Sequence, residues 1–241
     1  HGWLMISDPE GEFEERKIRI IRAHLEEDAG KSMHDEEAGI ADSRIDLNRT
    51  GTPLLEIVSE PDIRSPRQAR IFLTELKLLL GYLDVSDCNM QEGSLRVDAN
   101  INLHIPDKEG MIATPIVEVK NVNSFRAVEK AMHFEAGRQY ERWQQTGEKL
   151  GDVPKQTRGW DDQAQLTRAQ RHKEESSDYR YLPDPDLVPV IVPAERVELI
   201  RTQTGELPAA LRDRLQKQYM ITAYTADVIV NQGRALVDYF V

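Results

Sequence analysis

Residues 97–105 alternate strictly between apolar and polar side chains, and no other feature of this sequence restricts its fold as strongly. The apolar positions are Val97, Ala99, Ile101, Leu103 and Ile105. Because successive side chains of an extended chain point to opposite faces, this pattern predicts a half-buried strand. Residues 116–122 are its expected partner, with Glu118 and Lys120 on one face and Val117 and Val119 on the other.

A third strand is predicted for residues 18–25, which run into the acidic segment Glu26-Glu27-Asp28 and the stop residue Gly30. The carboxylates therefore lie at the end of a strand. A turn is expected at residues 51–53, with another strand starting at Leu54.

Two long helices are predicted from their ends. Ser65, Pro66 and Gln68 stand in the order of an N-cap, a first-turn proline and a capping-box residue. A second helix begins at Ser124, runs to about residue 145 and ends at Gly147. Its expected packing residues are Phe125, Val128, Ala131, Met132 and Tyr140.

The predicted fold class is α+β, with an antiparallel-sheet domain in residues 1–150 followed by a small helical domain. Residues 151–193 are rich in Pro, Asp and Arg without a sustained period, so we predict a long connection with local turns, packed on or near the first domain. Residues 194–241 are predicted to be helical, in segments near 194–203, 208–219 and 222–231.

Charge and composition exclude several classes of protein. The net charge is −11, and residues 1–62 hold 16 acidic and 7 basic residues, so this part has no broadly basic surface for nucleic acid. One cysteine, Cys88, excludes an internal disulfide and a thiolate-rich zinc site. No run approaches the roughly 18 apolar residues of a membrane helix. The chain starts at His1 without an initiator methionine, so we expect an internal fragment of a longer protein.

The familiar nucleotide-binding and hydrolase motifs are absent from the sequence: there is no Walker loop, no His-Glu-x-x-His spacing and no nucleophile elbow around Ser94. What remains is a set of carboxylates at strand ends and on polar strand faces. These carboxylates are Glu26, Glu27, Asp28, Glu92, Asp98 and Glu118, with Lys31, Arg96 and Lys120 beside them. Carboxylate oxygens suit Mg²⁺. Surface ion pairing is the alternative that the sequence leaves open.

Several longer segments resemble one family. They are Ala23-His24-Leu25-Glu26-Glu27-Asp28-Ala29-Gly30-Lys31, residues 46–57, residues 56–62, residues 89–96, Glu118-Val119-Lys120-Asn121 and residues 178–187. In this order they are similar to the B subunits of the Asp/Glu-tRNA amidotransferases, and the resemblance covers essentially the whole chain. Two departures stand out. The family's opening segment, which supplies a Glu and a His near the metal, is not in this chain, and Gln91-Glu92 keeps one carboxylate where many members have two acids.

The resemblance implies a kinase-like cradle domain that uses ATP and Mg²⁺. In such proteins the side-chain carboxylate of Glu or Asp, mischarged on the glutamine or asparagine tRNA, is converted to an acyl phosphate. Ammonia from the A subunit then displaces the phosphate. The implied partners are the A (amidase) and C subunits and the mischarged Glu-tRNA(Gln) and Asp-tRNA(Asn), with no membrane. The implied compartment is the bacterial cytoplasm, or an organelle matrix in a eukaryote.

Roles follow from this resemblance for named residues. The expected catalytic carboxylates are Glu26, Glu27, Asp98 and Glu118, and the expected metal ligands are these four together with Glu92. The expected phosphate- and ATP-binding residues are Lys31, Arg96 and Lys120. Residues expected along an ammonia route or substrate loop are Asn48, Arg49, Asn100 and Asn121, with Asn102 and Asn123 as further polar lining; Asn123 is better explained as a residue that caps the following helix.

Basic and aromatic residues interleave in the long connection: Arg158, Trp160, Arg168, Arg171, Lys173, Tyr179, Arg180 and Tyr181. Because acidic residues share this stretch, we expect an interface loop rather than a free RNA-binding patch. Two other classes of function stay open: a non-catalytic scaffold or tRNA-binding subunit, and an independent ligase for small-molecule amides.

Overall fold

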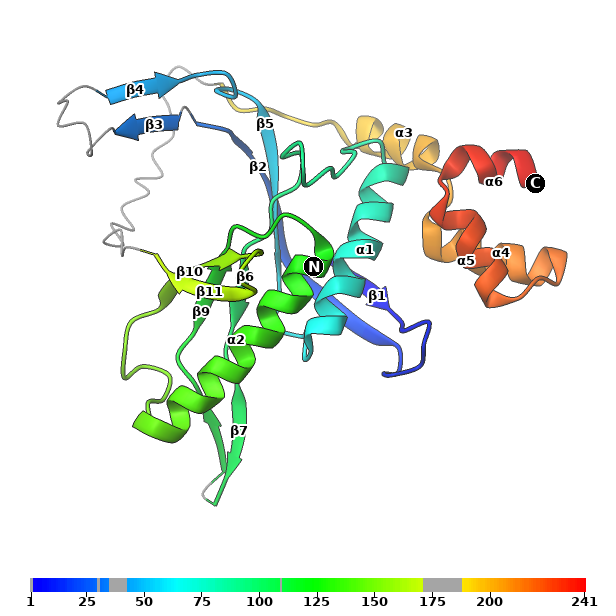
Figure 1. Cartoon of the computed structure of the whole chain (residues 1–241). Helices are drawn as coiled ribbons and strands as arrows, with labels where there is room; N and C mark the ends of the chain where they lie inside the picture. The colour runs from blue at the N-terminus through cyan, green and yellow to red at the C-terminus, as the bar shows by residue number, and fades with distance from the viewer. Residues whose placement is uncertain (1, 30, 35–42, 109, 171–187) are drawn as a thin grey trace. The chain divides into compact units, whose positions relative to one another are not determined.

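The computed structural model describes residues 2–29, 31–34, 43–108, 110–170 and 188–241. The chain divides into two compact units, His1–Arg64 and Ser65–Val241 (Figure 1). The motif at residues 178–187 lies outside the described residues, as do Arg171, Lys173, Tyr179, Arg180 and Tyr181. No helix in the described ranges has the length and apolar content needed to cross a membrane.

The first unit is built on a three-stranded antiparallel sheet in the order β1-β2-β5. Its strands are β1 (Gly2–Ile6), β2 (Arg16–Glu27) and β5 (Pro53–Ser59), and a separate pair joins β3 (Lys31–His34) to β4 (Ser43–Asp46). Ile6 and Ile18 are its buried core. The strand predicted at 18–25 is confirmed, and Glu26 and Glu27 are the last two residues of β2. The turn before β5 is also confirmed, with Gly51 at φ +78°.

The second unit holds a four-stranded sheet in the order β11-β10-β9-β6. Its strands are β6 (Ala99–Ile101), β9 (Val117–Lys120), β10 (Gln156–Asp161) and β11 (Leu166–Ala169). The α+β class is therefore confirmed, but this sheet is mixed, because β10 pairs with β9 in parallel. The reason is the long helix between these two strands, residues 125–146, which carries the chain back so that β10 runs in the same direction as β9.

The alternating segment 97–105 is divided between β6 and a second hairpin, made by β7 (His104–Asp107) and β8 (Gly110–Ala113). The predicted faces are nevertheless correct. Ile101 is buried and Asn100 is exposed on β6, and on β9 Val117 and Val119 are buried. The pairing of β6 with β9 is antiparallel, as expected for a half-buried pair.

Residues 151–193 contain more structure than the sequence predicted. Strands β10 and β11 belong to the main sheet of the second unit, whereas we expected only local turns. These strands are short and mix charged, glycine and aromatic residues, so the alternation that reveals a strand is obscured.

The two long helices begin where the sequence predicts. In α1 (Pro66–Tyr82) Ser65 accepts a hydrogen bond from the Gln68 N–H, and in α2 (Phe125–Thr146) Ser124 accepts one from the Ala127 N–H. Helix α2 ends at Gly147, with φ +70°. Of its expected packing residues, Tyr140 is wrong, because it is 44% exposed and packs on neighbouring Trp143.

The C-terminal helices are α3 (Ala194–Thr204), α4 (Pro208–Tyr219), α5 (Ala223–Asn231) and α6 (Arg234–Phe240), the last of which the sequence did not predict separately. A buried cluster joins α4, α5 and α6 to α1: Tyr82, Leu211, Leu215, Ala226, Ile229, Val230 and Val237. Arg212 bridges Glu75 and Asp227 in the same contact. The compact division falls at residue 65, and the boundaries at residues 150 and 193 stay predictions.

Candidate functional site

A histidine and two carboxylates come together on one face of the first sheet. His24 and Glu26 lie on β2, and Glu56 lies directly opposite His24 on β5. The His24 Nε2 atom is 3.9 Å from Glu26 Oε2 and 3.7 Å from Glu56 Oε2. Ligand atoms of the three residues lie within 4.8 Å of one another, which makes them a group that could hold a metal ion.

Strand periodicity determines which acids join this group. Residues 22, 24 and 26 are two positions apart, so Arg22, His24 and Glu26 share one face of β2. Glu27 follows Glu26 directly and therefore points to the opposite face. The geometry favours Glu26 over Glu27 as a member of this cluster.

The two carboxylates of this cluster are the kind of ligand that Mg²⁺ prefers, whereas the imidazole of His24 is more typical of transition metals. Two carboxylates at a half-exposed position supply oxygen ligands and leave room for water, which Mg²⁺ usually keeps. Arg22 occupies part of the set: its Nη2 is 3.0 Å from Glu56 Oε1, and its Nε donates to His24 Nδ1 at 3.3 Å. The nitrogen of His24 that faces the carboxylates is therefore Nε2.

The sequence reasoning missed His24 and Glu56 as members of a site. Both stand in segments that carried the resemblance, but the pairing of β2 with β5 that brings them together cannot be deduced from either segment alone. The available signal was the spacing of Arg22, His24 and Glu26, which puts three polar side chains on one strand face.

A second polar group lies on the sheet of the other unit, on the face opposite α2. Lys120 Nζ is 2.5 Å from Asp98 Oδ2 and 3.6 Å from Glu118 Oε2. Two further residues reach Glu118: Lys155, just before β10, has Nζ 3.3 Å from Oε1, and the Thr157 hydroxyl of β10 donates to Oε2 at 3.3 Å. We call these five residues the sheet-face cluster. It brings together three residues that the sequence predicted, and it adds Lys155 and Thr157.

The register of three strands produces the sheet-face cluster. Asn100 of β6 and Thr157 of β10 are both paired with Glu118 of β9, so the three side chains form one row across the sheet. Burial lowers the pKa of Lys120, but the hydrogen bond and charge of Asp98 and the charge of Glu118 outweigh it, and the net pKa is raised. The ammonium form is therefore favoured.

The other predicted site residues have other surroundings. Asn121, at φ +63°, donates to the Trp160 carbonyl, which gives it a structural role beside the sheet. Glu92 is exposed in a turn. Arg49 pairs with Asp28 at 2.9 Å, and the Asn48 amide donates to Asp46. Arg96 is exposed, and Lys31 begins β3, with a side chain that lies outside the described part.

The further polar residues are also accounted for. The Asn102 amide donates to the Thr114 carbonyl at 3.4 Å, and Asn123 is exposed just before the N-cap of α2. Trp160 is 3% exposed, so it is not available for an RNA-binding surface. Arg168 is exposed and pairs with Asp161 at 2.9 Å.

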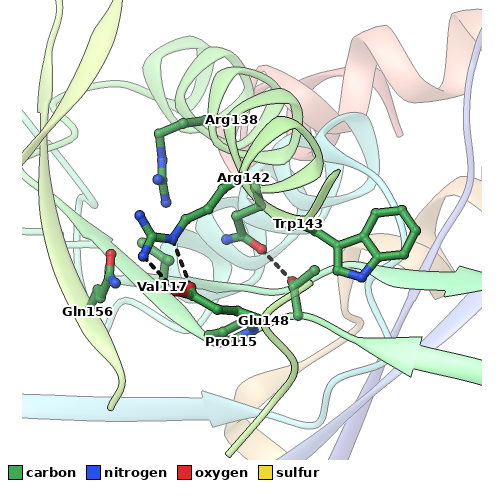
Figure 2. A pocket seen from close by; sticks show the side chains of 9 residues that line it. Pro115, Val117, Arg138, Arg142, Trp143, Glu148 and Gln156 are labelled. Carbon is green, nitrogen blue, oxygen red and sulfur yellow. Dashed lines mark hydrogen bonds and ion pairs between the residues drawn. The ribbon is translucent and has the colours of Figure 1, made fainter. Parts of the chain in front are cut away.

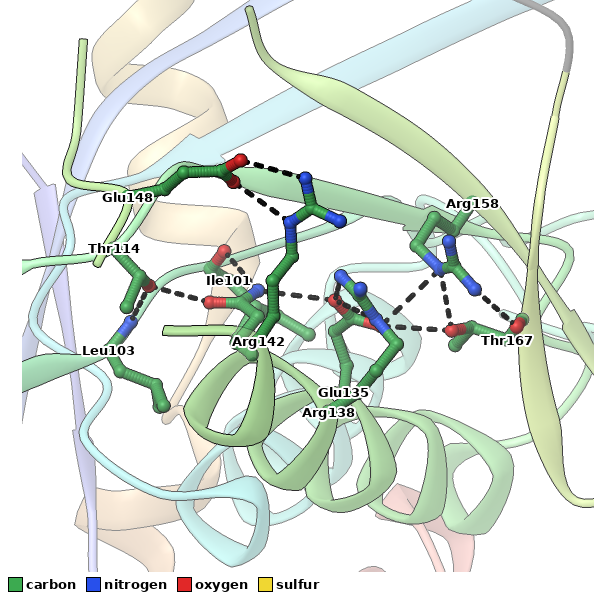
Figure 3. A network of polar contacts seen from close by, with 10 residues as sticks. Ile101, Leu103, Thr114, Glu135, Arg138, Arg142, Glu148, Arg158 and Thr167 are labelled. Atoms are coloured by element: carbon green, nitrogen blue, oxygen red, sulfur yellow. Dashed lines mark hydrogen bonds and ion pairs between the residues drawn. The ribbon is translucent and has the colours of Figure 1, made fainter. Parts of the chain in front are cut away.

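The opposite face of this sheet is held to α2 by a buried polar network (Figure 3). Glu135 is fully buried. Its two oxygens share the Nε–H of Arg138, and the carboxylate also accepts from Arg138 Nη2 at 2.6 Å and from the Thr167 hydroxyl at 2.9 Å. Gln139 continues the network by donating to the Ile101 carbonyl and accepting from the Thr114 hydroxyl. Burial and the charge of Arg138 lower the pKa of Arg158, which lies 3.6 Å from Glu135.

A hollow next to this network is lined by Thr114, Pro115, Val117, Arg138, Gln139, Arg142, Trp143, Glu148 and Gln156 (Figure 2). Its free volume is about 20 Å³, which is room for a single water molecule and far too little for a nucleotide. The Arg142–Glu148 ion pair at its rim, 2.8 Å long, fixes the turn after α2. This hollow belongs to the packing of the helix, and the candidate chemistry lies in the two polar groups on the sheet faces.

The fold and these groups define an α+β protein with carboxylates and ammonium groups on open sheet faces. Comparison with known proteins is more specific: residues 1–198 match the family model described as the GatB/GatE catalytic domain. The chain therefore belongs to this family.

Individual relatives agree with the family match. The chain is 62% identical over 239 residues to the B subunit of the aspartyl/glutamyl-tRNA(Asn/Gln) amidotransferase from Rhodopirellula baltica, covering 99% of this chain and 48% of the relative. It is 44% identical over 241 residues to the protein of the same name from Carboxydothermus hydrogenoformans, covering 100% of this chain and 48% of that protein. The chain thus spans about half the length of these curated relatives.

Proposed function

We propose that this chain is the catalytic part of the B subunit of a tRNA-dependent amidotransferase. In this role it activates the side-chain carboxylate of Glu or Asp, mischarged on tRNA, with ATP and Mg²⁺. Support comes from the family to which the chain belongs and from the names of its relatives. The observation that carries the proposal is the convergence of His24, Glu26 and Glu56 within the matched region.

The proposed reaction explains why such a site is rich in charge. A carboxylate is a poor acyl donor, and conversion to an acyl phosphate supplies a good leaving group. Two anions must meet for this step, so fixed cations have to offset their repulsion. When bound, Mg²⁺ neutralises charge on the reacting oxygens. Glu26 and Glu56 would hold it, and Glu27, Glu92 and Asp98 stay as further metal candidates.

The positive residues of the chain take the complementary role in this proposal. Lys120 would bind phosphate as an ammonium, together with Arg96 and Lys31. Asp98, 2.5 Å from Lys120, keeps that ammonium in place. A cation held in advance costs no reorganisation when negative charge develops.

Ammonia must reach the acyl phosphate before water does, so the proposal includes an enclosed route from the partner A subunit. Asn48, Arg49 and Asn100 are its polar candidates in this chain. The C subunit and the tRNAs, Glu-tRNA(Gln) and Asp-tRNA(Asn), complete the proposed assembly.

The experiment uses the full-length protein, reconstituted with its A and C subunits, and follows the formation of Gln-tRNA(Gln) and Asn-tRNA(Asn). Amidation should require both ATP and Mg²⁺. Glu56→Gln should reduce kcat by at least about a hundredfold, the usual loss when one electrostatic group is removed from a site of charge development. The matched control is Glu141→Gln, an exposed glutamate on α2.

Two results would decide against the proposal. Wild-type amidation by the Glu56→Gln variant would remove the group of His24, Glu26 and Glu56 from the chemistry and favour the alternative of a scaffold or tRNA-binding subunit. Amidation of a free amino acid without tRNA or partner subunits would instead indicate an independent amide ligase.

A further inference from the structure

The contacts of Glu118 differ from those expected of a metal ligand. Both of its carboxylate oxygens already have partners: Oε1 lies 3.3 Å from Lys155 Nζ, and Oε2 lies 3.6 Å from Lys120 Nζ and accepts from the Thr157 hydroxyl at 3.3 Å. The partners come from β9 itself and from the neighbouring strand β10 or the residue just before it. Glu118 therefore stands between two ammonium groups.

A divalent cation is poorly served at this position. A Mg²⁺ ion bound to a carboxylate lies about 2.1 Å from its oxygen. Beside Glu118 it would meet the charges of Lys120 and Lys155 at short range, in a partly buried place where repulsion is only weakly screened. The Glu118 side chain is 18% exposed. The two lysines neutralise the charge that would attract the metal.

The same geometry suits a polyanion. The side chains of Lys120 and Lys155 are 38% and 36% exposed, so they reach solvent on the same sheet face. Each ammonium carries three N–H donors, and the contact with Glu118 uses one of them at most. A further donor of Lys120 is used by Asp98. Lys155 has Glu118 as its one ion-pair partner among the described residues.

We propose that Lys155 is a phosphate-binding residue of the nucleotide site, and that Glu118 is a positioning residue that holds Lys155 and Lys120 side by side for the polyphosphate. This inference rests on the proposed function. It assigns a role to Lys155, which lies outside the motifs of the sequence, and it changes the role of Glu118 from metal ligand to anchor of two cations. The Thr157 hydroxyl, on the strand that follows Lys155, donates to the Glu118 carboxylate and helps to fix it.

The test uses the full-length protein in the reconstituted complex. Calorimetry measures the affinity for ADP with Mg²⁺, and steady-state kinetics separate KM for ATP from kcat. Lys155→Met should weaken ADP binding and raise KM for ATP about tenfold, the size expected for a lost hydrogen bond between charged groups. Lys155→Arg should restore most of the affinity. The control is Lys130→Met, an exposed lysine on α2.

Glu118→Gln separates positioning from metal binding. Titration with Mn²⁺ alone, followed by electron paramagnetic resonance, measures the metal without nucleotide. We expect this variant to keep the Mn²⁺ affinity of the wild type while its ADP affinity falls. Glu56→Gln should show the opposite pattern, with a larger loss of Mn²⁺ affinity than of ADP affinity.

The outcomes are distinct. Loss of Mn²⁺ binding in Glu118→Gln, or unchanged ADP affinity in Lys155→Met, would overturn the inference. Melting temperatures of the variants check that each one is folded. If Lys155→Met is not folded, the ADP affinity of Lys155→Arg, which keeps the positive charge, tests the inference in its place. A wild-type complex that binds no adenine nucleotide would refute the proposed function itself, independently of these variants.

Discussion

Replacing Glu135 with alanine should destabilise the second unit severely. Its carboxylate is fully buried and bonds Arg138 and Thr167, with Arg158 3.6 Å away. The substitution leaves two guanidinium groups at the interface between α2 and the sheet without this carboxylate. Removing one partner of a buried ion pair costs about 3–5 kcal/mol.

Hydrogen exchange read by mass spectrometry is the suitable assay, because a chain with two compact units need not unfold in a single two-state step. Peptides from 125–146 and 156–169 report the interface directly. A loss of about 3 kcal/mol speeds exchange through local opening by roughly 150-fold. Glu135→Gln should cost less, since the amide oxygen still accepts hydrogen bonds.

Glu141→Gln is the matched control on the same helix, exposed and expected to change stability by less than about 0.5 kcal/mol. If Glu135→Ala slowed or barely changed exchange in both peptides, the network would contribute little. That result would mean that the apolar contacts of α2, with Val128 and Ala131, hold the helix by themselves.

The remaining predictions concern the ends of elements. The Asp62 carboxylate accepts hydrogen bonds from the Arg19 side chain and from the Arg19 backbone N–H, and these contacts lower the pKa of Asp62 below its ordinary value. The contribution of ionised Asp62 to folding stability is therefore complete above about pH 4, and it is lost as the pH falls through the lowered pKa. The melting-temperature difference between wild type and Asp62→Asn should shrink from pH 7 to pH 3; an equal difference at both would refute the pairing. Gly147→Ala should cost about 1 kcal/mol, because residue 147 is left-handed, and exchange at the C-terminal end of α2 measures it. No change there would show that the turn adapts.

Local signals predicted most of the helices and the strands β2, β5, β6 and β9, but not the complete sheets to which these strands belong. Ser65, Ser124 and Gly147 mark helix ends because capping depends on residues within one turn, and such signals survive without any tertiary information. The alternation at 97–101 gave the correct faces of β6 for a similar reason, since side-chain direction in a strand follows from the backbone.

The pairing of distant strands could not be predicted. Glu56 meets His24 because β5 adopts one register on β2, and a shift by a single residue would turn it to the other face. Glu135 and Gln139 were missed for another reason. Charged and amide residues on a helix are expected in solvent, and their burial depends on partners from β6, β8 and β11 or the residues beside them.

Strand β10 has a consequence for how this part of the chain can vary in length. Arg158 and Trp160 point to α2, while Lys155 and Thr157 face the opposite side. Adding or deleting one residue within the strand would exchange these two sets, placing an ammonium in the interior and an indole in solvent. The turn at residues 147–152 contains no residue of either face. Insertions and deletions in this part of the chain should therefore be tolerated in that turn and excluded from residues 155–160.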